Sequence, residues 1–212
     1  MQRYDFLLRI KNEKIFFFYL ILITTKCSEI KKKYLISLYI FVNKKYFMYF
    51  CQNLKSFYVM EKTLIILKPS AMQRELVGAV INRFEKKGLQ IVGIKMMQLS
   101  DSLLTEHYAH LVDKPFFPRL TEAMKASPVI VACLQGVDCV QVVRNITGVT
   151  NGRNAQAGTI RGDFSMSGQE NIIHASDSVE NALIEINRFF KPEEIFNYEK
   201  SNISFVYASD EI

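Results

Sequence analysis

Every glycine and every proline of this 212-residue chain lies after Met60, and this asymmetry is the strongest constraint on how the chain can fold. All 9 Gly and all 5 Pro belong to the second segment. A folded segment of sixty residues normally needs these residue types for its turns. We therefore expect the folded domain to follow Met60 and treat residues 1–60 as a separate segment.

The charge divides at the same position. Of the 27 Lys and Arg and the 21 Asp and Glu in the chain, residues 1–60 hold 11 and 3, a net charge of +8. The remainder has a net charge of −2, and the two together give the +6 of the whole chain. Because the expected domain is slightly acidic, the basic total does not indicate nucleic-acid binding, and no nucleic-acid partner is expected.

Residues 1–60 have several interpretations. Their Ile, Phe, Tyr, Lys and Asn content favours an A/T-rich stretch translated from a wrongly chosen start, with Met60 as the true initiator. A membrane anchor is the alternative, since residues 15–23 and 34–42 are apolar runs, although both are shorter than the ~18–20 residues that span a bilayer. A cleaved signal peptide is less favoured, because no small-residue cleavage site follows residues 15–23.

The cysteines and two of the histidines give no metal-binding pattern. Cys27, Cys51, Cys133 and Cys139 form no CxxC pair, and Cys133 lies in an apolar run typical of a buried thiol. A reducing, cytoplasmic location is therefore expected. His107 and His110 are three residues apart on an expected helix without a visible third ligand, so we expect them on its surface.

Short apolar strands alternate with amphipathic helices between residues 61 and 198, the predicted domain, and residues 199–212 form a tail. Strands are predicted at residues 63–67, 89–99, 128–134 and 171–174, and helices at 76–84, 100–111, 114–126, 138–147 and 178–190. This order favours an α/β (α+β) class, specifically a ferredoxin-like βαββαβ sandwich with additional helices.

A long loop at residues 148–168 precedes the last predicted strand. A loop of about 20 residues within a compact domain is more often functional than not. It brings Arg161 and Thr150 into the neighbourhood of Arg144 and His174, a set suited to gripping phosphate beside a nucleophile. Arg161 and Asp163 could equally form a structural ion pair. Neither a GxxxxGK[ST] phosphate loop nor the protein-kinase signatures occur in the chain.

Four short segments resemble the nucleoside diphosphate kinase family. They are TLIILKPS at residues 63–70, EHY with KPFF at 106–117, GTIRGDF at 158–164 and NIIHASDS at 171–178. The resemblance runs from about Glu61 to Tyr198. It implies transfer of the γ-phosphate of a nucleoside triphosphate, typically ATP, to a nucleoside diphosphate by a ping-pong mechanism.

In that resemblance His174 is the nucleophile that becomes phosphorylated, Glu185 orients its imidazole, and Ser176 and Asp177 support it. Lys68 is both catalytic and nucleotide-binding. The other nucleotide-binding positions implied by the resemblance are Tyr108, Phe116, Leu120, Arg144, Thr150, Arg161 and Asn171. Phe116 would stack on the base, Leu120 would line its site, and Asn171 would bind the ribose.

The resemblance also implies Mg²⁺ held by the nucleotide phosphates with no direct protein ligand, and a homo-oligomer, either a hexamer or a tetramer of dimers. Four positions depart from the family pattern. Glycine is usual at Ala175, prolines are usual at Gly152 and Ala157, and a side chain that contacts the base is common at Gly168. They motivate an alternative, a nucleotide-binding or partner-binding member of the family with little turnover.

Overall fold

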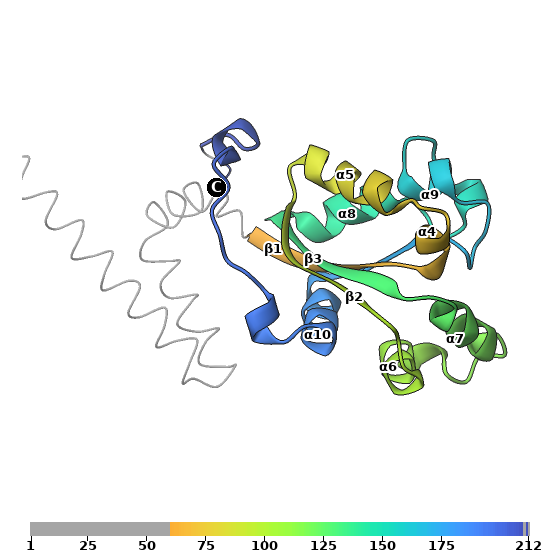
Figure 1. Cartoon of the computed structure of the whole chain (residues 1–212). Coiled ribbons are helices and arrows are strands. Elements are labelled where there is room, and N and C mark those ends of the chain that lie inside the picture. The colour runs from red at the N-terminus through yellow and green to blue at the C-terminus, as the bar shows by residue number, and fades with distance from the viewer. Residues whose placement is uncertain (1–59, 210, 212) are drawn as a thin grey trace, which may run out of the picture. The chain divides into compact units, whose positions relative to one another are not determined.

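A computed structural model describes residues 60–209 and 211 of the chain (Figure 1). The apolar runs at residues 15–23 and 34–42, together with Cys27 and Cys51, lie outside the described residues. Within those residues, no helix combines the length and the apolar character needed to cross a membrane.

Four strands form one antiparallel sheet in the order β2-β3-β1-β4. Their bounds are Met60–Leu67 for β1, Gln90–Met97 for β2, Val129–Val137 for β3 and Ile173–Ala175 for β4. The first strand begins before the predicted Thr63 because Met60, Glu61 and Lys62 pair with β3. The last strand begins two residues later than predicted and includes Ala175.

Helices and short 3₁₀ turns connect the strands. The helices are α4 (Pro69–Gln73), α5 (Val77–Lys87), α6 (Asp101–His107), α7 (Phe117–Lys125), α8 (Cys139–Thr147), α9 (Ile160–Phe164) and α10 (Val179–Phe189). The 3₁₀ turns are η1 (Ala109–Leu111), η2 (Gly152–Asn154), η3 (Pro192–Glu194) and η4 (Ile203–Phe205). The resulting βαββαβ order with extra helices confirms the predicted ferredoxin-like fold.

The helix α4 was not predicted, and the largest differences from the predicted helix boundaries lie between residues 100 and 168. The helix expected at residues 100–111 ends at His107 and continues as η1, and the helix expected from Lys114 begins at Phe117, with Pro118 in its first turn. The region 148–168 is not all loop, because it contains η2 and α9. The Thr159 hydroxyl starts α9 by accepting a hydrogen bond from the Gly162 N–H at 3.0 Å.

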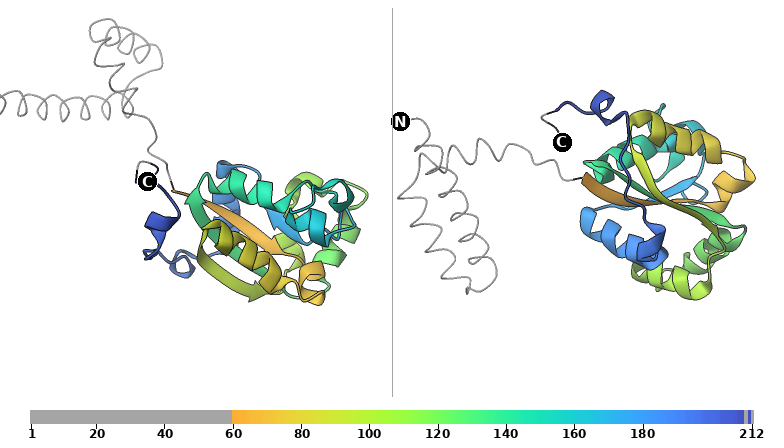
Figure 2. Two further views of the ribbon diagram at one scale, coloured as in Figure 1. Left: turned by 90° about the horizontal axis from the view of Figure 1, so that it is seen from above. Right: turned by 60° about the vertical axis from the view of Figure 1, so that its left-hand side comes forward.

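Helices cover both faces of the sheet. Along β1, Leu64 and Ile66 face one cluster of buried side chains while Ile65 and Leu67 face the other, as strand geometry requires. The first cluster includes side chains from α6, α7 and α10, and the second includes side chains from α5, α8 and α9. Figures 1 and 2 show the sheet between these two groups of helices.

A tight turn at Ile172 leads into β4. Ile172 has a φ of 71°, and the N–H of Ile173 donates to the carbonyl of Asn171 at 2.8 Å, which together define a γ-turn. This conformation is rare and strained for a β-branched residue. The Ile172 side chain is fully buried, and its carbonyl accepts a hydrogen bond from the Lys68 N–H at 2.9 Å. The turn therefore fixes Asn171 and β4 against the end of β1.

The segment after α10 packs back onto the sheet. The Phe196 N–H donates to the Val92 carbonyl at 2.7 Å, and the Tyr198 hydroxyl donates to the Ile91 carbonyl at 2.8 Å. Farther along, the Tyr207 hydroxyl accepts a hydrogen bond from the Val137 N–H at 3.2 Å. The tail predicted at residues 199–212 therefore contacts the domain through its described part (Figure 2).

The N-cap of α10 gives a first testable prediction. The Ser178 hydroxyl accepts a hydrogen bond from the Asn181 N–H at 3.1 Å, so Ser178→Ala should lower the free energy of unfolding by about 1 kcal/mol. Urea unfolding measures the change, and Ser201→Ala in the exposed tail is the control. Equal stability of Ser178→Ala and the unmodified chain would contradict the capping role.

Candidate active site

His174 lies at the middle of β4, opposite Ile66 of β1. Its side chain is 20% exposed, so the imidazole is held by the fold yet reachable from solvent. The strand positions the ring, and α10 follows directly after the strand. The predicted nucleophile therefore lies where the sheet and α10 meet.

Glu185 of α10 holds one edge of that ring. Both of its carboxylate oxygens lie close to Nε2 of His174, at 3.1 and 3.0 Å. The hydroxyl of Ser176 donates to the same carboxylate at 2.6 Å, and Ser176 is itself anchored to the backbone of Leu64. Burial alone would raise the pKa of Glu185, but the hydrogen bonds from His174 and Ser176 and the nearby imidazoles keep that pKa below its ordinary value.

His107 is not on the surface, which corrects the sequence prediction. Its ring packs edge-on against the ring of His174, with centroids 4.7 Å apart and an interplanar angle of 78°. Its side chain is only 1% exposed. Burial, with a further contribution from His174, lowers its pKa to about 3, so its imidazole is neutral at physiological pH. His110 is exposed, as predicted.

Lys68 and Asn171 form a buried polar pair at the end of β1. The Lys68 ammonium donates to Oδ1 of Asn171 at 2.6 Å. The Asn171 amide then donates to the carbonyls of Thr150 at 3.0 Å and Gly168 at 2.8 Å. Burial lowers the pKa of Lys68 to about 8, and the nearby charge of Arg161 adds to this effect.

Arg161 braces the backbone around the site. Its guanidinium donates to the carbonyls of Gly148 at 2.8 Å, Asn171 at 3.3 Å and Ile173 at 2.6 Å. The structural ion pair considered for Asp163 forms instead with Arg83, at 2.5 Å. Arg161 therefore ties the long loop region to β4, immediately beside His174.

The other predicted site residues range from buried to exposed. Tyr108 is buried, with its ring 6.3 Å from that of His174 between centroids, and Asp177 bonds to Asn181 at 2.7 Å. Arg144 and Thr150 are exposed. On α7 and its N-cap, Phe116 is 44% exposed while Leu120 packs partly against the core.

Of the four departures from the family pattern, Gly152 is the one that its surroundings require to be glycine. Ala175 is a regular strand residue paired with Ile65, so its Cβ requires no unusual backbone conformation. A Cβ at Gly152 would collide with the backbone of Ser165, so this glycine permits close packing of the loop. Gly168 still supplies its carbonyl to Asn171. Ala157 is exposed in the turn before α9.

Three side chains at the centre could in principle ligate a metal ion. His107, His174 and Glu185 each offer a donor atom within 4.8 Å of the others. Two imidazoles and one carboxylate suit zinc rather than Mg²⁺, which prefers oxygen ligands. The guanidinium of Arg188 also lies 3.5 Å from Nδ1 of His107, where its charge opposes a bound cation.

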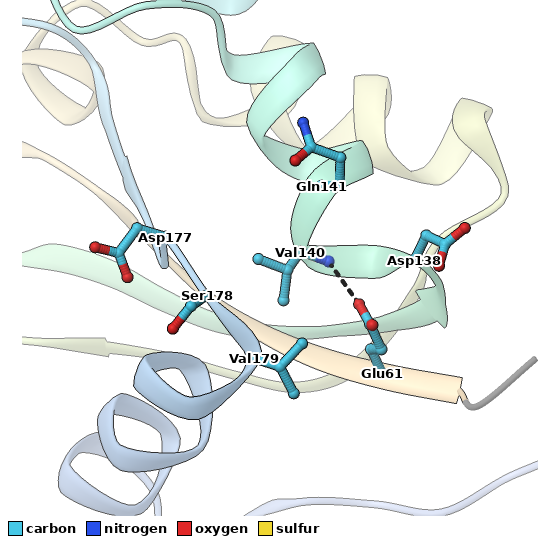
Figure 3. A pocket seen from close by; sticks show the side chains of 7 residues that line it. All are labelled: Glu61, Asp138, Val140, Gln141, Asp177, Ser178 and Val179. Atoms are coloured by element: carbon cyan, nitrogen blue, oxygen red, sulfur yellow. Dashed lines mark hydrogen bonds between the residues drawn. The ribbon is translucent and has the colours of Figure 1, made fainter.

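A separate hollow of about 390 Å³ lies between the starts of α8 and α10 (Figure 3). Two of its three acidic side chains, Glu61 and Asp177, have structural partners. Glu61 accepts a hydrogen bond from the Val140 N–H at 3.3 Å, near the start of α8, and Asp177 bonds to Asn181. Asp177 is the one predicted site residue in the lining of this hollow.

Sequence reasoning missed the residues that support the central pair from behind. His107 is the first of these: it is buried together with Leu104 of α6 and with Tyr108 at the C-cap, and this spacing of three and four residues is typical of a buried helix face. Arg188 and Glu106 carried no such signal. Their 2.7 Å ion pair joins residues 82 positions apart, so only the folded chain reveals it.

Comparison with known proteins decides the family. The sequence model described as nucleoside diphosphate kinase matches residues 61–195. The chain belongs to the nucleoside diphosphate kinase family. It is therefore a phosphotransferase that moves phosphate between nucleoside tri- and diphosphates through a phosphohistidine, as the resemblance implied.

Individual relatives agree with this assignment. The chain is 61% identical to a nucleoside diphosphate kinase of Parabacteroides distasonis over 152 residues, covering 72% of this chain and 99% of the relative. Among solved structures it resembles the Halobacterium salinarum enzyme in complex with CDP, with a TM-score of 0.69 and 36% identity, covering 70% of this chain and 99% of the other. The Babesia bovis family protein has a TM-score of 0.68 and 37% identity, with 70% of this chain and all of the other covered.

The lowered pKa of Lys68 gives a second prediction. With a pKa of about 8 the amine is half protonated at pH 8, and a bound phosphate should return the pKa toward its ordinary value of 10.5. Binding of ADP at pH 8 should therefore take up about half a proton per chain. Calorimetry in buffers of different ionisation enthalpy measures this uptake. The same proton uptake in Lys68→Met would contradict the prediction that Lys68 binds phosphate.

Proposed function

We propose that this chain transfers the γ-phosphate of a nucleoside triphosphate, typically ATP, to a nucleoside diphosphate through a phosphohistidine at His174. The observation that carries the proposal is the bond between Glu185 and Nε2 of His174. A carboxylate only accepts hydrogen bonds, so Nε2 must carry the proton. The lone pair of the neutral imidazole is then on Nδ1, the atom that we assign as the nucleophile.

Glu185 also serves the reaction itself. When Nδ1 attacks the γ-phosphorus, the bond from that phosphorus to the β–γ bridging oxygen breaks and the nucleoside diphosphate leaves. Positive charge develops on the imidazole, and the adjacent carboxylate stabilises it. Ser176 holds that carboxylate in place, so little reorganisation is needed at the moment of transfer. After transfer to the diphosphate, the imidazole returns to the same Nε2–H tautomer. One arrangement thus serves both halves of a ping-pong reaction.

The cationic groups beside His174 are suited to the phosphates. Phosphoryl transfer depends mainly on positioning and on charge stabilisation. Lys68 and Arg161 provide positive charge at the end of β1 and beside β4, and we assign them to the phosphate oxygens together with Arg144, Thr150 and Tyr108. We assign Asn171 to the ribose and Phe116, with Leu120, to the base, since stacking tolerates any base.

The site is suited to Mg²⁺ that is bound to the nucleotide rather than to the protein. The groups around His174 are mainly cations, amides and imidazoles, with Glu185 already engaged, so they offer Mg²⁺ few oxygen ligands. The ion would be held by the nucleotide phosphates, whose charge it neutralises. Lys68 and Arg161 would then receive the remaining phosphate charge.

Phosphate labelling tests the proposed nucleophile. Incubation with γ-labelled ATP and Mg²⁺ should give one acid-labile, base-stable phosphate per chain, and His174→Gln should give none because the only proposed acceptor is lost. His110→Gln is the matched control, since His110 is exposed and is not assigned to the site. Full labelling of the His174 variant would rule out the proposed route.

The alternative is a family member that binds nucleotides with little turnover. The departures that motivate it, Ala175 above all, leave the His174–Glu185 pair intact. Phosphotransfer is therefore the better supported reading. Normal binding of ADP together with negligible exchange of phosphate between nucleotides would favour the alternative.

We also propose that the chain assembles into a homo-oligomer. Strand β2 is an edge strand, and it exposes Ile94 by 51% and Met96 by 60%. An exposed apolar edge readily pairs with another chain. The hexamer and the tetramer of dimers implied by the family resemblance would both use such a contact.

Substitution on this edge tests the assembly. Ile94→Glu with Met96→Lys should reduce the assembled mass, because charge on the strand opposes its burial against a second copy. Light scattering after size-exclusion chromatography measures the mass, with Val112→Glu, exposed away from β2, as the control. An unchanged mass would place the contact elsewhere.

A cytoplasmic location is also proposed. Its support is that Cys133 and Cys139 are buried free thiols, which suit a reducing compartment. Burial raises the pKa of Cys133 to about 12, consistent with the inert thiol predicted from the sequence. The boundaries at residues 60 and 198, and the interpretations of residues 1–60, stay predictions.

A further inference from the structure

A second group of side chains lies behind the His174–Glu185 pair, on the side away from Nδ1 of His174. Arg188 of α10 donates from Nε to Glu106 of α6 at 2.7 Å. Another nitrogen of the same guanidinium lies 3.5 Å from Nδ1 of His107. The Arg188 side chain is only 14% exposed, whereas that of Glu106 is 63% exposed. This group links α6 to α10 directly behind the proposed nucleophile.

His107 has two possible neutral tautomers, and its neighbours decide between them. Within the described part of the chain, its Nε2 is buried and has no hydrogen-bond partner in either tautomer. The choice therefore depends on Nδ1. Two groups face that atom: the Arg188 guanidinium at 3.5 Å and the Glu185 carboxylate, with Oε1 at 3.8 Å.

These two neighbours favour opposite tautomers. A guanidinium can only donate, so it favours a lone pair on Nδ1, whereas a carboxylate can only accept and favours an N–H there. Arg188 is closer, and its position is fixed by Glu106. The lone pair therefore faces Arg188, and His107 carries its proton on Nε2.

We propose that Arg188, held by Glu106, is a positioning residue that locks His107 in the Nε2–H tautomer and so reserves the Glu185 carboxylate for His174. In the other tautomer, Nδ1–H of His107 would point toward Oε1 of Glu185. A modest movement from 3.8 Å would then create a hydrogen bond that competes with the one from His174. The function of Glu185 as an orienting group thus depends on a charge that touches neither substrate nor nucleophile.

Nitrogen NMR of the three histidines gives the most direct test, because the two ring nitrogens differ in shift between tautomers. In the unmodified chain, His107 should show Nε2–H and an unprotonated Nδ1. In Arg188→Met the proton should move to Nδ1. Assignment uses His110→Asn and His174→Gln. A proton on Nδ1 of His107 in the unmodified chain would overturn the proposal, whether or not any variant folds.

Turnover gives the second readout and rests on the proposed function. Arg188→Met should lower kcat for phosphate exchange roughly tenfold, the effect of weakening about one hydrogen bond, with KM unchanged within about twofold. In a His107→Phe background, where no ring nitrogen can donate to Glu185, the same substitution should change kcat less than about twofold. Equal losses in both backgrounds would show a merely structural role for Arg188 and contradict the proposal.

A matched control separates this effect from the loss of an inter-helix ion pair. Lys125→Met breaks the 2.5 Å pair between α7 and Asp101 of α6, far from the imidazoles, and should leave kcat unchanged. Failure of the proposed function is distinguishable, since a His174→Gln chain that still exchanged phosphate would refute the nucleophile. The tautomer of His107 would be unaffected by that result.

Discussion

The bond between Nε2 of His174 and the carboxylate of Glu185 is the interaction on which the other features of the site depend. It joins β4 to α10, two elements that meet only because β4 pairs with β1 and the chain turns back immediately afterwards. Because the carboxylate can only accept, the bond also fixes which ring nitrogen is available for chemistry. A structural contact and a chemical assignment thus rest on the same two residues.

The positive groups of the site are positioned by backbone rather than by ion pairs. Arg161 donates to three main-chain carbonyls, and Lys68 donates to the side-chain amide oxygen of Asn171. The hydrogen-bond acceptors of both cations are therefore uncharged oxygens rather than carboxylates. Burial makes the Lys68 cation less stable when no anion is present, as its lowered pKa shows. Such groups favour an incoming phosphate more than exposed cations would.

Apolar periodicity was enough to predict the four strands and the main helices, whereas the candidate site residues were indicated by the resemblance to the nucleoside diphosphate kinase family. His174, Ser176 and Glu185 lie within eleven residues of one another, but their expected functions came from the resemblance alone, since spacing by itself left His174 a lone histidine near a helix start. The environment of His107 could not be predicted in the same way, because it depends on α6 packing against α10. The short helix α9 could not be predicted either, because its five residues are too few to show a helical period. The γ-turn at Ile172 contradicts the preference of a β-branched residue and is imposed by the surrounding fold.

The identity of the phosphorylated nitrogen tests this account most directly. If Glu185 holds the Nε2–H of His174, the phosphate must be on Nδ1. Phosphorus–proton correlation NMR of the phosphorylated, denatured chain distinguishes the two isomers through the ring protons that couple to phosphorus. Phosphate on Nδ1 of His174 is the predicted result, and phosphate on Nε2 would contradict the geometry from which the mechanism is derived.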